Sequence, residues 1–340
     1  MTSNKDIRPP VVLTMGEPSG IAPEITLKAW LARDECSIPA FFVAGDADLY
    51  RQVAGALSME VPVEKIRNPR EAKDVFSRAL PVLSIALKEP SVPGSLSPAN
   101  ASAVLSSIDL ASDLALDAEV SAIVTNPIHK RALYEAGFNL PGHTEYLAGR
   151  CGGATPVMML SCPGLRVVPV TVHLSLGAAV AALSAEVIIE QGQILAQSLI
   201  ADFGIKRPRI AVAALNPHAG EEGHLGREEI EVIAPAIKTL RTRVPEAEIR
   251  GPAPADTLFH AAARESYDAV LCMYHDQALI PLKTIDFERG VNTTLGLSIV
   301  RTSPDHGTAL DIAGRGQAHA GSLVEAIRAA EQIALHRASA

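Results

Sequence analysis

Three runs of apolar, β-branched residues along the chain each end at a histidine. They are VVPVTVH (167–173), RIAVAALNPH (209–218) and DAVLCMYH (268–275), and the terminal residues are His173, His218 and His275. Continuous Val, Ile, Leu and Ala without polar alternation is typical of parallel strands buried on both faces. Because ligands of open α/β sheets bind beyond the carboxyl ends of the strands, we expect the three imidazoles at one sheet edge.

The rest of the chain alternates strands with helices, which is the signature of an α/β fold. Further strands are predicted at 10–15, 40–45, 61–66 and 122–127, with a hairpin of strands 155–160 and 165–172 across Pro163-Gly164. Helices are predicted from Pro23 onward and at 99–118, 185–202, 227–242, 255–265 and 321–337. The 99–118 helix has the clearest pattern, because apolar residues recur at helical spacing from Ala101 to Ala115 and form one buried stripe.

Length and charge restrict the possible architectures and partners. A chain of 340 residues is long enough for two lobes that share a cleft, and no repeat or flexible linker separates them. The net charge of −8 argues against nucleic acid or an anionic membrane surface as partner. The four cysteines lack C-x-x-C spacing and the N-terminus does not resemble a signal peptide, so we expect a cytoplasmic protein with reduced thiols.

Several common motifs are absent from the sequence. No G-x-G-x-x-G follows the first strand, and Gly314-Arg315-Gly316 near the C-terminus lacks the third glycine, so a Rossmann dinucleotide site is unsupported. There is likewise no P-loop, no H-E-x-x-H and no G-x-S-x-G nucleophile elbow.

The strand-end histidines are candidate ligands of a divalent metal. Three neutral imidazoles with an open coordination position suit Zn²⁺, or another divalent ion that adds oxygen ligands. The alternative is that they are unrelated polar residues at the starts of loops, and their repetition at one structural position favours the metal. Asp256 is a candidate further ligand or ligand partner, and a helix N-cap or first-turn role explains it equally well.

Basic and amide residues downstream of His275 suggest an anion site. The segment 290–300 contains Asn292 and is flanked by Lys283, Arg289 and Arg301. These side chains would hold a phosphate or carboxylate. For Arg289 a solvated surface role is at least as well supported.

Two polar segments are further candidates for binding. Pro141-Gly142-His143-Thr144-Glu145 opens a short helix, where free N–H groups can bind anions, although it also fits a capping turn with Thr144 as N-cap. A loop with Asp305, His306, Gly307, Thr308 and Asp311 could receive an adenosine or phosphate group. The remaining histidines are assigned surface or satisfied structural roles, namely His129, His224, His260, His319 and His336.

Taken together, these segments resemble the family of 4-hydroxythreonine-4-phosphate dehydrogenases, which act in vitamin B6 biosynthesis. The resemblance extends from TMGEPSGIAPE at 14–24 to HGTALDIAGRG at 306–316, and many ordered blocks are more specific than any single motif. The blocks between them are TNPIHK (125–130), PGHTEYL (141–147), LNPHAGEEGHLGREE (215–229), PADTLF (254–259), MYHDQ (273–277) and RGVNTTLGLSIVRTSPDHGTA (289–309).

The resemblance implies a fold and a set of roles. The fold would be α/β and similar to isocitrate and isopropylmalate dehydrogenases, with two α/β/α lobes, a cleft between them and no Rossmann glycine motif. One lobe, 1–125 plus 286–340, would be on the nucleotide side, and the other, 126–285, would bind metal and form the dimer.

The same resemblance implies ligands and partners at named positions. His173, His218 and His275 would bind zinc, magnesium or cobalt, with His275 supplied across a homodimer interface. A phosphorylated substrate would be contacted by His143, Thr144, Lys283, Asn292 and Arg301. The loop 305–316 would contact NAD or NADP.

The implied reaction is oxidation of 4-phosphohydroxy-L-threonine at C3, followed by decarboxylation. A metal-bound water, Asp256 and Lys283 are the candidates for moving the proton. Related enzymes oxidise 4-phospho-threonate or 4-phospho-erythronate, and no residue here separates these substrates. Phosphate acyltransferases share the broad fold but need neither metal nor NAD, and a non-catalytic binding protein is the weakest alternative.

Overall fold

The computed structural model describes residues 8–138 and 142–339 and divides the chain into two compact units. Unit 1 comprises 1–155 and 297–334, and unit 2 comprises 156–296 and 335–340. Residues 126–155 therefore belong with unit 1, and residues 286–296 and 335–340 with unit 2, whereas the sequence-based boundaries assigned each of these segments to the other lobe. Residues 126–155 join unit 1 because α6 (His143–Arg150) is anchored to α4 (Ala101–Leu116), with Tyr146 and Arg150 bonded to Asp109.

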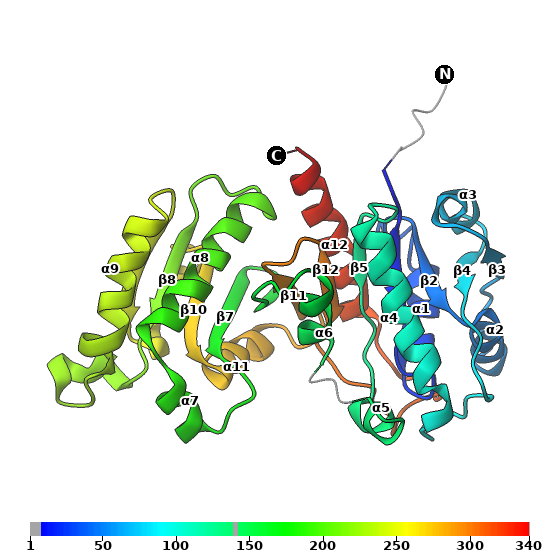
Figure 1. Ribbon diagram of the computed structural model, residues 1–340, viewed down its shortest axis with the longest axis horizontal. Coiled ribbons are helices and arrows are strands. Elements are labelled where there is room, and N and C mark those ends of the chain that lie inside the picture. Colours follow the sequence, from blue (N-terminus) through cyan, green and yellow to red (C-terminus); the bar gives the residue numbers. More distant parts are fainter. Residues whose placement is uncertain (1–7, 139–141, 340) are drawn as a thin grey trace. The chain divides into compact units, whose positions relative to one another are not determined.

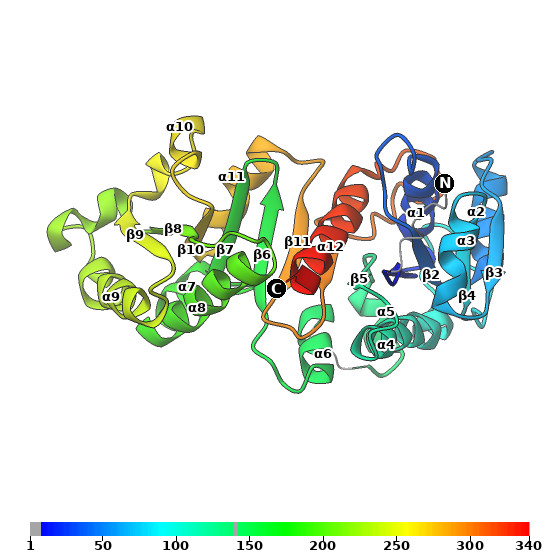
Figure 2. The ribbon, with the colours of Figure 1, turned by 90° about the horizontal axis from the view of Figure 1, so that it is seen from above.

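The sheet of unit 1 is entirely parallel (Figure 1). Its strands run in the order β3 (Val63–Ile66), β4 (Leu80–Ser84), β2 (Phe41–Gly45), β1 (Val11–Thr14), β5 (Ala122–Val124) and β12 (Arg301–Pro304). Strands β2, β1, β5 and β12 are buried at every residue, as expected for apolar runs covered on both faces. Figure 2 shows α4 and α12 (Gly321–Ser339) on opposite sides of β5.

The other helices of unit 1 follow the strands in chain order. They are α1 (Ala22–Leu31), α2 (Ala47–Ala56), α3 (Ala72–Phe76) and α5 (Lys130–Glu135). Helix α1 begins with Pro23 in its first turn and buries Ile25, Leu27 and Trp30, so the predicted helix start is confirmed.

The sheet of unit 2 is mixed. Its order is β11 (Val291–Leu295), β6 (Val157–Cys162), β7 (Leu165–Thr171), β10 (Ala269–Tyr274), β8 (Arg209–Ala213) and β9 (Glu248–Ala253). β6 and β7 form the predicted hairpin and β11 pairs antiparallel with β6, whereas β7, β10, β8 and β9 pair in parallel.

Helices cover both faces of this sheet. Helices α8 (Ala185–Ala201) and α9 (Ala234–Arg243) pack on one face with Val168, and α11 (His275–Ile285) packs on the other with Val167. Gly192 lets α8 approach α9 closely, because a Cβ there would lie 2.7 Å from Leu240 Cδ1. The shorter helix α7 (Leu176–Ala182) precedes α8.

Several elements were not predicted from the sequence, namely strands β9, β11 and β12 and helices α2, α3, α5, α7 and α11. Three further points need correction. The strand β4 was not predicted, since LPVLS is short and contains Pro81. The predicted helix 255–265 is two short helices, η5 (Ala255–Thr257) and α10 (Ala261–Arg264), because η5 ends at Thr257 and His260 then caps α10 by accepting a hydrogen bond from Ala263 N. The helix at 227–242 begins as a π turn, η4 (Glu229–Ile233), before α9, where Pro235 lacks an N–H.

In the part of the chain that the structure describes, no single helix is long and apolar enough to span a membrane. The sharply bent pair α7 and α8 meets that test only when the two are combined, by length and composition alone.

Candidate functional site

The three strand-end histidines follow three neighbouring parallel strands of unit 2. His173 comes after β7, His275 begins α11 directly after β10, and His218 lies in the loop after β8. These strands are adjacent in the order β7, β10, β8. The predicted arrangement of the strands is therefore confirmed, and it delivers the three residues to one edge of this sheet.

Two of these histidines have a left-handed backbone. The φ angle is +51° at His173 and +52° at His218. A side chain with a Cβ rarely adopts this conformation, which costs about 1–3 kcal/mol for each residue and clusters at functional sites. The strain at both positions is a second, independent indication of function, and the sequence gives no sign of it.

The structure brings two of the imidazoles together. The ring centroids of His173 and His275 are 6.1 Å apart. His275 Nδ1 and Asp276 Oδ1 are 2.7 Å apart, so the other ring nitrogen of His275 is left to face a ligand. Within residues 8–138 and 142–339, no group of three His, Cys, Asp or Glu side chains of one chain is placed to hold a metal ion. The donor chemistry of the three imidazoles fits a divalent metal.

Asp256 is the second residue of η5, and its side chain makes no capping hydrogen bond there. It is exposed and lines a hollow of unit 2 together with Tyr274, Asp276 and Gln277. Asp256 therefore shares this hollow with the residue that follows His275. Its first-turn position in η5 is confirmed, whereas the N-cap residue is Pro254.

Unit 1 contains a buried cation at the end of β5. Arg301 is 4% exposed, and its Nε and Nη2 donate to Thr125 Oγ1 over 3.1 and 2.6 Å. Burial lowers the pKa of the Arg301 guanidinium to about 10, while Glu145 acts in the opposite direction, so the side chain is charged at neutral pH. A buried guanidinium that a hydroxyl orients has the chemistry to bind an anion.

His143 lies beside this cation. Its Nε2 is buried and has no hydrogen-bond partner among the described residues. Burial first, and then the charges of Arg301 and Lys130, lower the pKa of His143 to about 3. His143 is therefore a neutral imidazole with an unsatisfied polar atom next to two cations, which suits hydrogen bonding to a bound anion.

The start of α6 presents this histidine. Gly142 is the N-cap residue and Thr144 is the second residue of the helix, so the alternative of Thr144 as N-cap is wrong. Pro141, which opened the predicted motif, lies outside the described residues, as do residues 1–7. Thr125 and Lys130 had not been singled out as binding residues, although both lie in the TNPIHK block.

The low pKa of His143 predicts a pH-dependent stability. Because the unfolded chain has the higher histidine pKa, it binds more protons than the folded protein between about pH 3 and 6.5. The free energy of unfolding should therefore fall as the pH is lowered through this range, by at most about 1.4 kcal/mol per pH unit. We expect His143→Gln to flatten this dependence in chemical denaturation at a series of pH values; a variant with the wild-type slope would contradict the assignment.

Two other predicted substrate residues lie in unit 2. Lys283 is in the last turn of α11, where its Nζ lies 5.6 Å from the ring centroid of Phe287. Asn292 is on β11, and its Oδ1 is buried without a hydrogen-bond partner among the described residues. Arg289 is exposed and forms an ion pair with Asp286, which supports its surface role.

The predicted cofactor loop is attached to α1. Its five candidate residues are Asp305, His306, Gly307, Thr308 and Asp311, and among them Thr308 is buried and accepts a hydrogen bond from Ile21 N through its carbonyl at 3.0 Å. The buried Glu24 accepts from Ala318 N at 2.9 Å, and Lys28 Nζ donates to the carbonyls of Gly316 and Ala318. Glu24 and Lys28, which form an ion pair over 2.8 Å, together fix the end of the loop. Asp311 is exposed.

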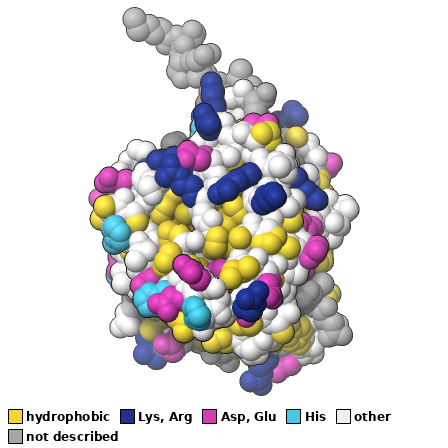
Figure 3. All heavy atoms as spheres, turned by 90° about the vertical axis from the view of Figure 1, so that its left-hand side faces the viewer, with side chains coloured by type: hydrophobic (Ala, Val, Ile, Leu, Met, Phe, Trp, Pro, Cys, Tyr) yellow, Lys and Arg dark blue, Asp and Glu magenta, His cyan; other side chains and the backbone are white. Residues whose placement is uncertain are grey.

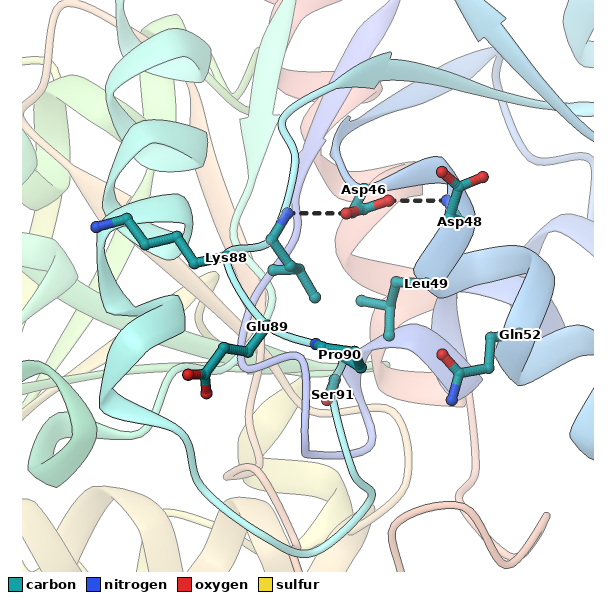
Figure 4. Close-up of a pocket in the computed structure, with 9 residues that line it drawn as sticks. Asp46, Asp48, Leu49, Gln52, Lys88, Glu89, Pro90 and Ser91 are labelled. Carbon is teal, nitrogen blue, oxygen red and sulfur yellow. Dashed lines mark hydrogen bonds between the residues drawn. The ribbon is translucent and has the colours of Figure 1, made fainter.

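A hollow in unit 1 is lined by none of the predicted site residues (Figure 4). Asp46 is fixed there, since its two carboxylate oxygens accept from Asp48 N and Leu87 N, each at 2.8 Å. Asp48 and Glu89 also line it, so its charge does not suit a phosphate. His129 was expected at the surface or with its ring nitrogens hydrogen-bonded. In the structure its Nδ1 is buried without a hydrogen-bond partner among the described residues.

Known proteins resemble this chain over nearly its whole length. The 4-hydroxythreonine-4-phosphate dehydrogenase of Caulobacter vibrioides is 52% identical over 334 residues, covering 96% of this chain and 98% of the relative. The enzyme of the same name from Bradyrhizobium diazoefficiens is 49% identical over 339 residues, with 96% and 97% covered. The crystal structure of 4-hydroxythreonine-4-phosphate dehydrogenase from Klebsiella pneumoniae matches with a TM-score of 0.85 and 38% identity, covering 96% of this chain and 99% of that one.

These similarities confirm the α/β fold class and the family expected from the sequence blocks. The model of the family described as pyridoxal phosphate biosynthetic protein PdxA matches residues 37–330. The chain therefore belongs to the PdxA family of pyridoxal phosphate biosynthetic proteins.

Proposed function

We propose that this protein is a 4-hydroxythreonine-4-phosphate dehydrogenase. It oxidises 4-phosphohydroxy-L-threonine at C3 to 2-amino-3-oxo-4-(phosphooxy)butanoate, which loses CO₂ to give 3-amino-2-oxopropyl phosphate. The observation that carries this proposal is the 52% identity to the Caulobacter enzyme over nearly the full length of both chains. The buried cation of unit 1 and the strand-end histidines of unit 2 supply the kinds of group that this chemistry requires.

We infer that a divalent ion, zinc, magnesium or cobalt, is held by His173, His218 and His275. The strain at the first two residues and the carboxylate beside the third support these ligands. When bound, such an ion acts as a Lewis acid that lowers the pKa of the substrate C3 hydroxyl and polarises the carbonyl formed from it.

The phosphate or carboxylate of the substrate would be held by Arg301 and Lys283. Arg301 is already oriented by Thr125, and an anion would offset the cost of burying its charge. His143 and Thr144 complete this clamp from the start of α6, and the buried Oδ1 of Asn292 would accept a hydrogen bond from a donor group of the substrate. Because His143 is neutral, it recognises the anion by hydrogen bonding and not by charge.

The proton of the C3 hydroxyl needs an acceptor, for which Asp256 and Lys283 are the candidate residues. Asp256 is exposed in the hollow beside Asp276, so a proton taken there can pass to water. The hydride acceptor would be NAD or NADP, held by the segment from Asp305 to Asp311. The tether of that loop to α1 through Glu24 and Lys28 supports a fixed cofactor position.

We further propose that the active protein is a homodimer with His275 supplied across the interface. Unit 2 exposes large apolar side chains on three segments, namely Leu174, Leu176, Val180, Leu225, Ile230, Ile280 and Phe287. The face viewed in Figure 3 also shows hydrophobic side chains gathered between Lys and Arg above and His below. Apolar surface of this kind marks interaction sites.

The four free cysteines support a reducing, cytoplasmic location.

One assay tests the proposed reaction. Purified protein is mixed with 4-phosphohydroxy-L-threonine, NAD⁺ or NADP⁺, and Zn²⁺, Mg²⁺ or Co²⁺, and the absorbance of the reduced cofactor is followed. We expect turnover that a strong chelator abolishes and added metal restores, because a strong chelator competes with the three imidazoles for the metal ion. Turnover indifferent to the chelator would overturn the metal proposal, and faster turnover of 4-phospho-threonate would change the substrate.

A further inference from the structure

The loop that carries His218 has an unusual backbone. Five consecutive residues have positive φ, from His218 at +52° through Ala219 at +55°, Gly220 at +80° and Glu221 at +42° to Glu222 at +55°. Only Gly220 adopts this conformation without steric cost. Each of the other four residues costs about 1–2 kcal/mol, so this left-handed loop persists only if other contacts hold it.

A buried carboxylate lies under this loop. Glu229 is 3% exposed, and its Oε1 accepts from Leu215 N at 2.8 Å and from Asn216 N at 2.7 Å. Its Oε2 accepts from Asn216 Nδ2 at 3.0 Å. The loop closes directly over this oxygen, since a Cβ at Gly220 would lie 2.7 Å from Glu229 Oε2.

The position of Glu229 in its own element is also fixed. It is the first residue of the π turn η4, which continues into α9, and the buried Ile233 in the same turn packs into the core of unit 2. π turns of this kind are frequent at functional sites, because the extra residue redirects a side chain. Glu229 therefore connects a rigid helix to Leu215 and Asn216, which lie shortly before the left-handed run.

We propose that Glu229 is a positioning residue that holds the left-handed loop and so orients the His218 imidazole toward a divalent metal. This inference rests on the proposed function, in which His218 is a ligand. A carboxylate is suited to the role because it only accepts hydrogen bonds and meets three N–H donors. A glutamine would turn an NH₂ group toward some of these donors and would release part of the loop.

The test compares Co²⁺ binding to the full-length wild-type protein with binding to Glu229→Gln, by calorimetry and by the visible absorption of bound cobalt. We expect Co²⁺ affinity to fall by about 10- to 100-fold, the range found when residues that orient metal ligands are replaced. Amide hydrogen exchange at 216–222 should also become faster. The matched control is Glu231→Gln, which removes an exposed carboxylate paired with Arg227 in the same turn and should leave affinity unchanged.

His218→Ala separates this inference from the proposed function. If His218→Ala binds Co²⁺ as tightly as wild type, the ligand role itself is wrong. If His218→Ala weakens binding while Glu229→Gln stays within twofold of wild type, the positioning role of Glu229 is overturned.

A second variant tests the strain directly. Ala219→Gly relieves one left-handed position, so adding it to Glu229→Gln should restore part of the stability and of the Co²⁺ affinity. A double variant that binds no more tightly than Glu229→Gln contradicts the role of strain. If Glu229→Gln alone does not fold, the double variant is compared with Ala219→Gly, and equal affinities overturn the proposal.

Discussion

Replacing His218 by alanine is expected to abolish formation of the reduced cofactor while leaving the protein folded. His218 is exposed, so few packing contacts are lost, and surface substitutions of this kind change stability by about 0.5 kcal/mol or less. Alanine meets the same left-handed strain as histidine, so the loop gains no new cost. Activity and bound metal, measured by elemental analysis, should fall together.

His224→Ala is the matched control for this substitution. His224 lies in the same loop, is also exposed, and is not a proposed ligand, so its replacement should keep both metal and activity. A His218→Ala protein with full metal content and full turnover would show that His218 is not a ligand.

A mixing experiment extends this prediction to the subunit arrangement. If His275 is supplied by the partner, a mixed dimer of His218→Ala and His275→Ala has one intact site and one doubly altered site. Random re-association should then restore about one quarter of the wild-type activity from two inactive proteins. No recovery after verified exchange would place all three ligands in one chain, where His173 and His275 already lie 6.1 Å apart.

The fold was predictable where the chain is strongly patterned. The apolar runs ending at His173, His218 and His275 are strands β7, β8 and β10, and helices at 99–118 and 185–202 were found within a few residues of their ends. The short strand β4 was missed, because its five residues include a proline. The break between η5 and α10 was missed too, because it depends on a histidine acting as a cap.

The candidate site was predictable only as a set of residue types. Sequence reasoning placed three imidazoles at neighbouring strand ends, because strand direction and sheet edge follow from local pattern. It gave no sign of the left-handed backbone at His218 or of Glu229 beneath it, since both depend on the path of a loop. The contact of Arg301 with Thr125 joins residues 176 positions apart, which only the assembled sheet brings together.

Replacing Arg301 by methionine is expected to lower kcat/KM for the phosphorylated substrate by about 10²- to 10³-fold. When one partner of a buried charge pair is truncated and the other charge stays buried, the binding free energy falls by about 3–4 kcal/mol. In this proposed pair the charge that stays buried is the substrate anion. Arg301→Lys should fall between the two proteins, because it keeps the charge but cannot form the two-donor contact with Thr125. Steady-state kinetics, together with calorimetric binding of inorganic phosphate, measure the effect.

The control for Arg301→Met has to remove a comparable arginine from the same unit. Arg33 has a side chain only 17% exposed, stacks on Trp30 and donates to the Ser77 carbonyl, so Arg33→Met should reduce Tm without changing KM. If Arg301→Met also changes only Tm and binds phosphate and substrate like wild type, then Arg301 is a structural residue. In that case the neutral His143 beside it would have no anion to recognise, and the substrate would have to be held by Lys283 and Asn292 of unit 2.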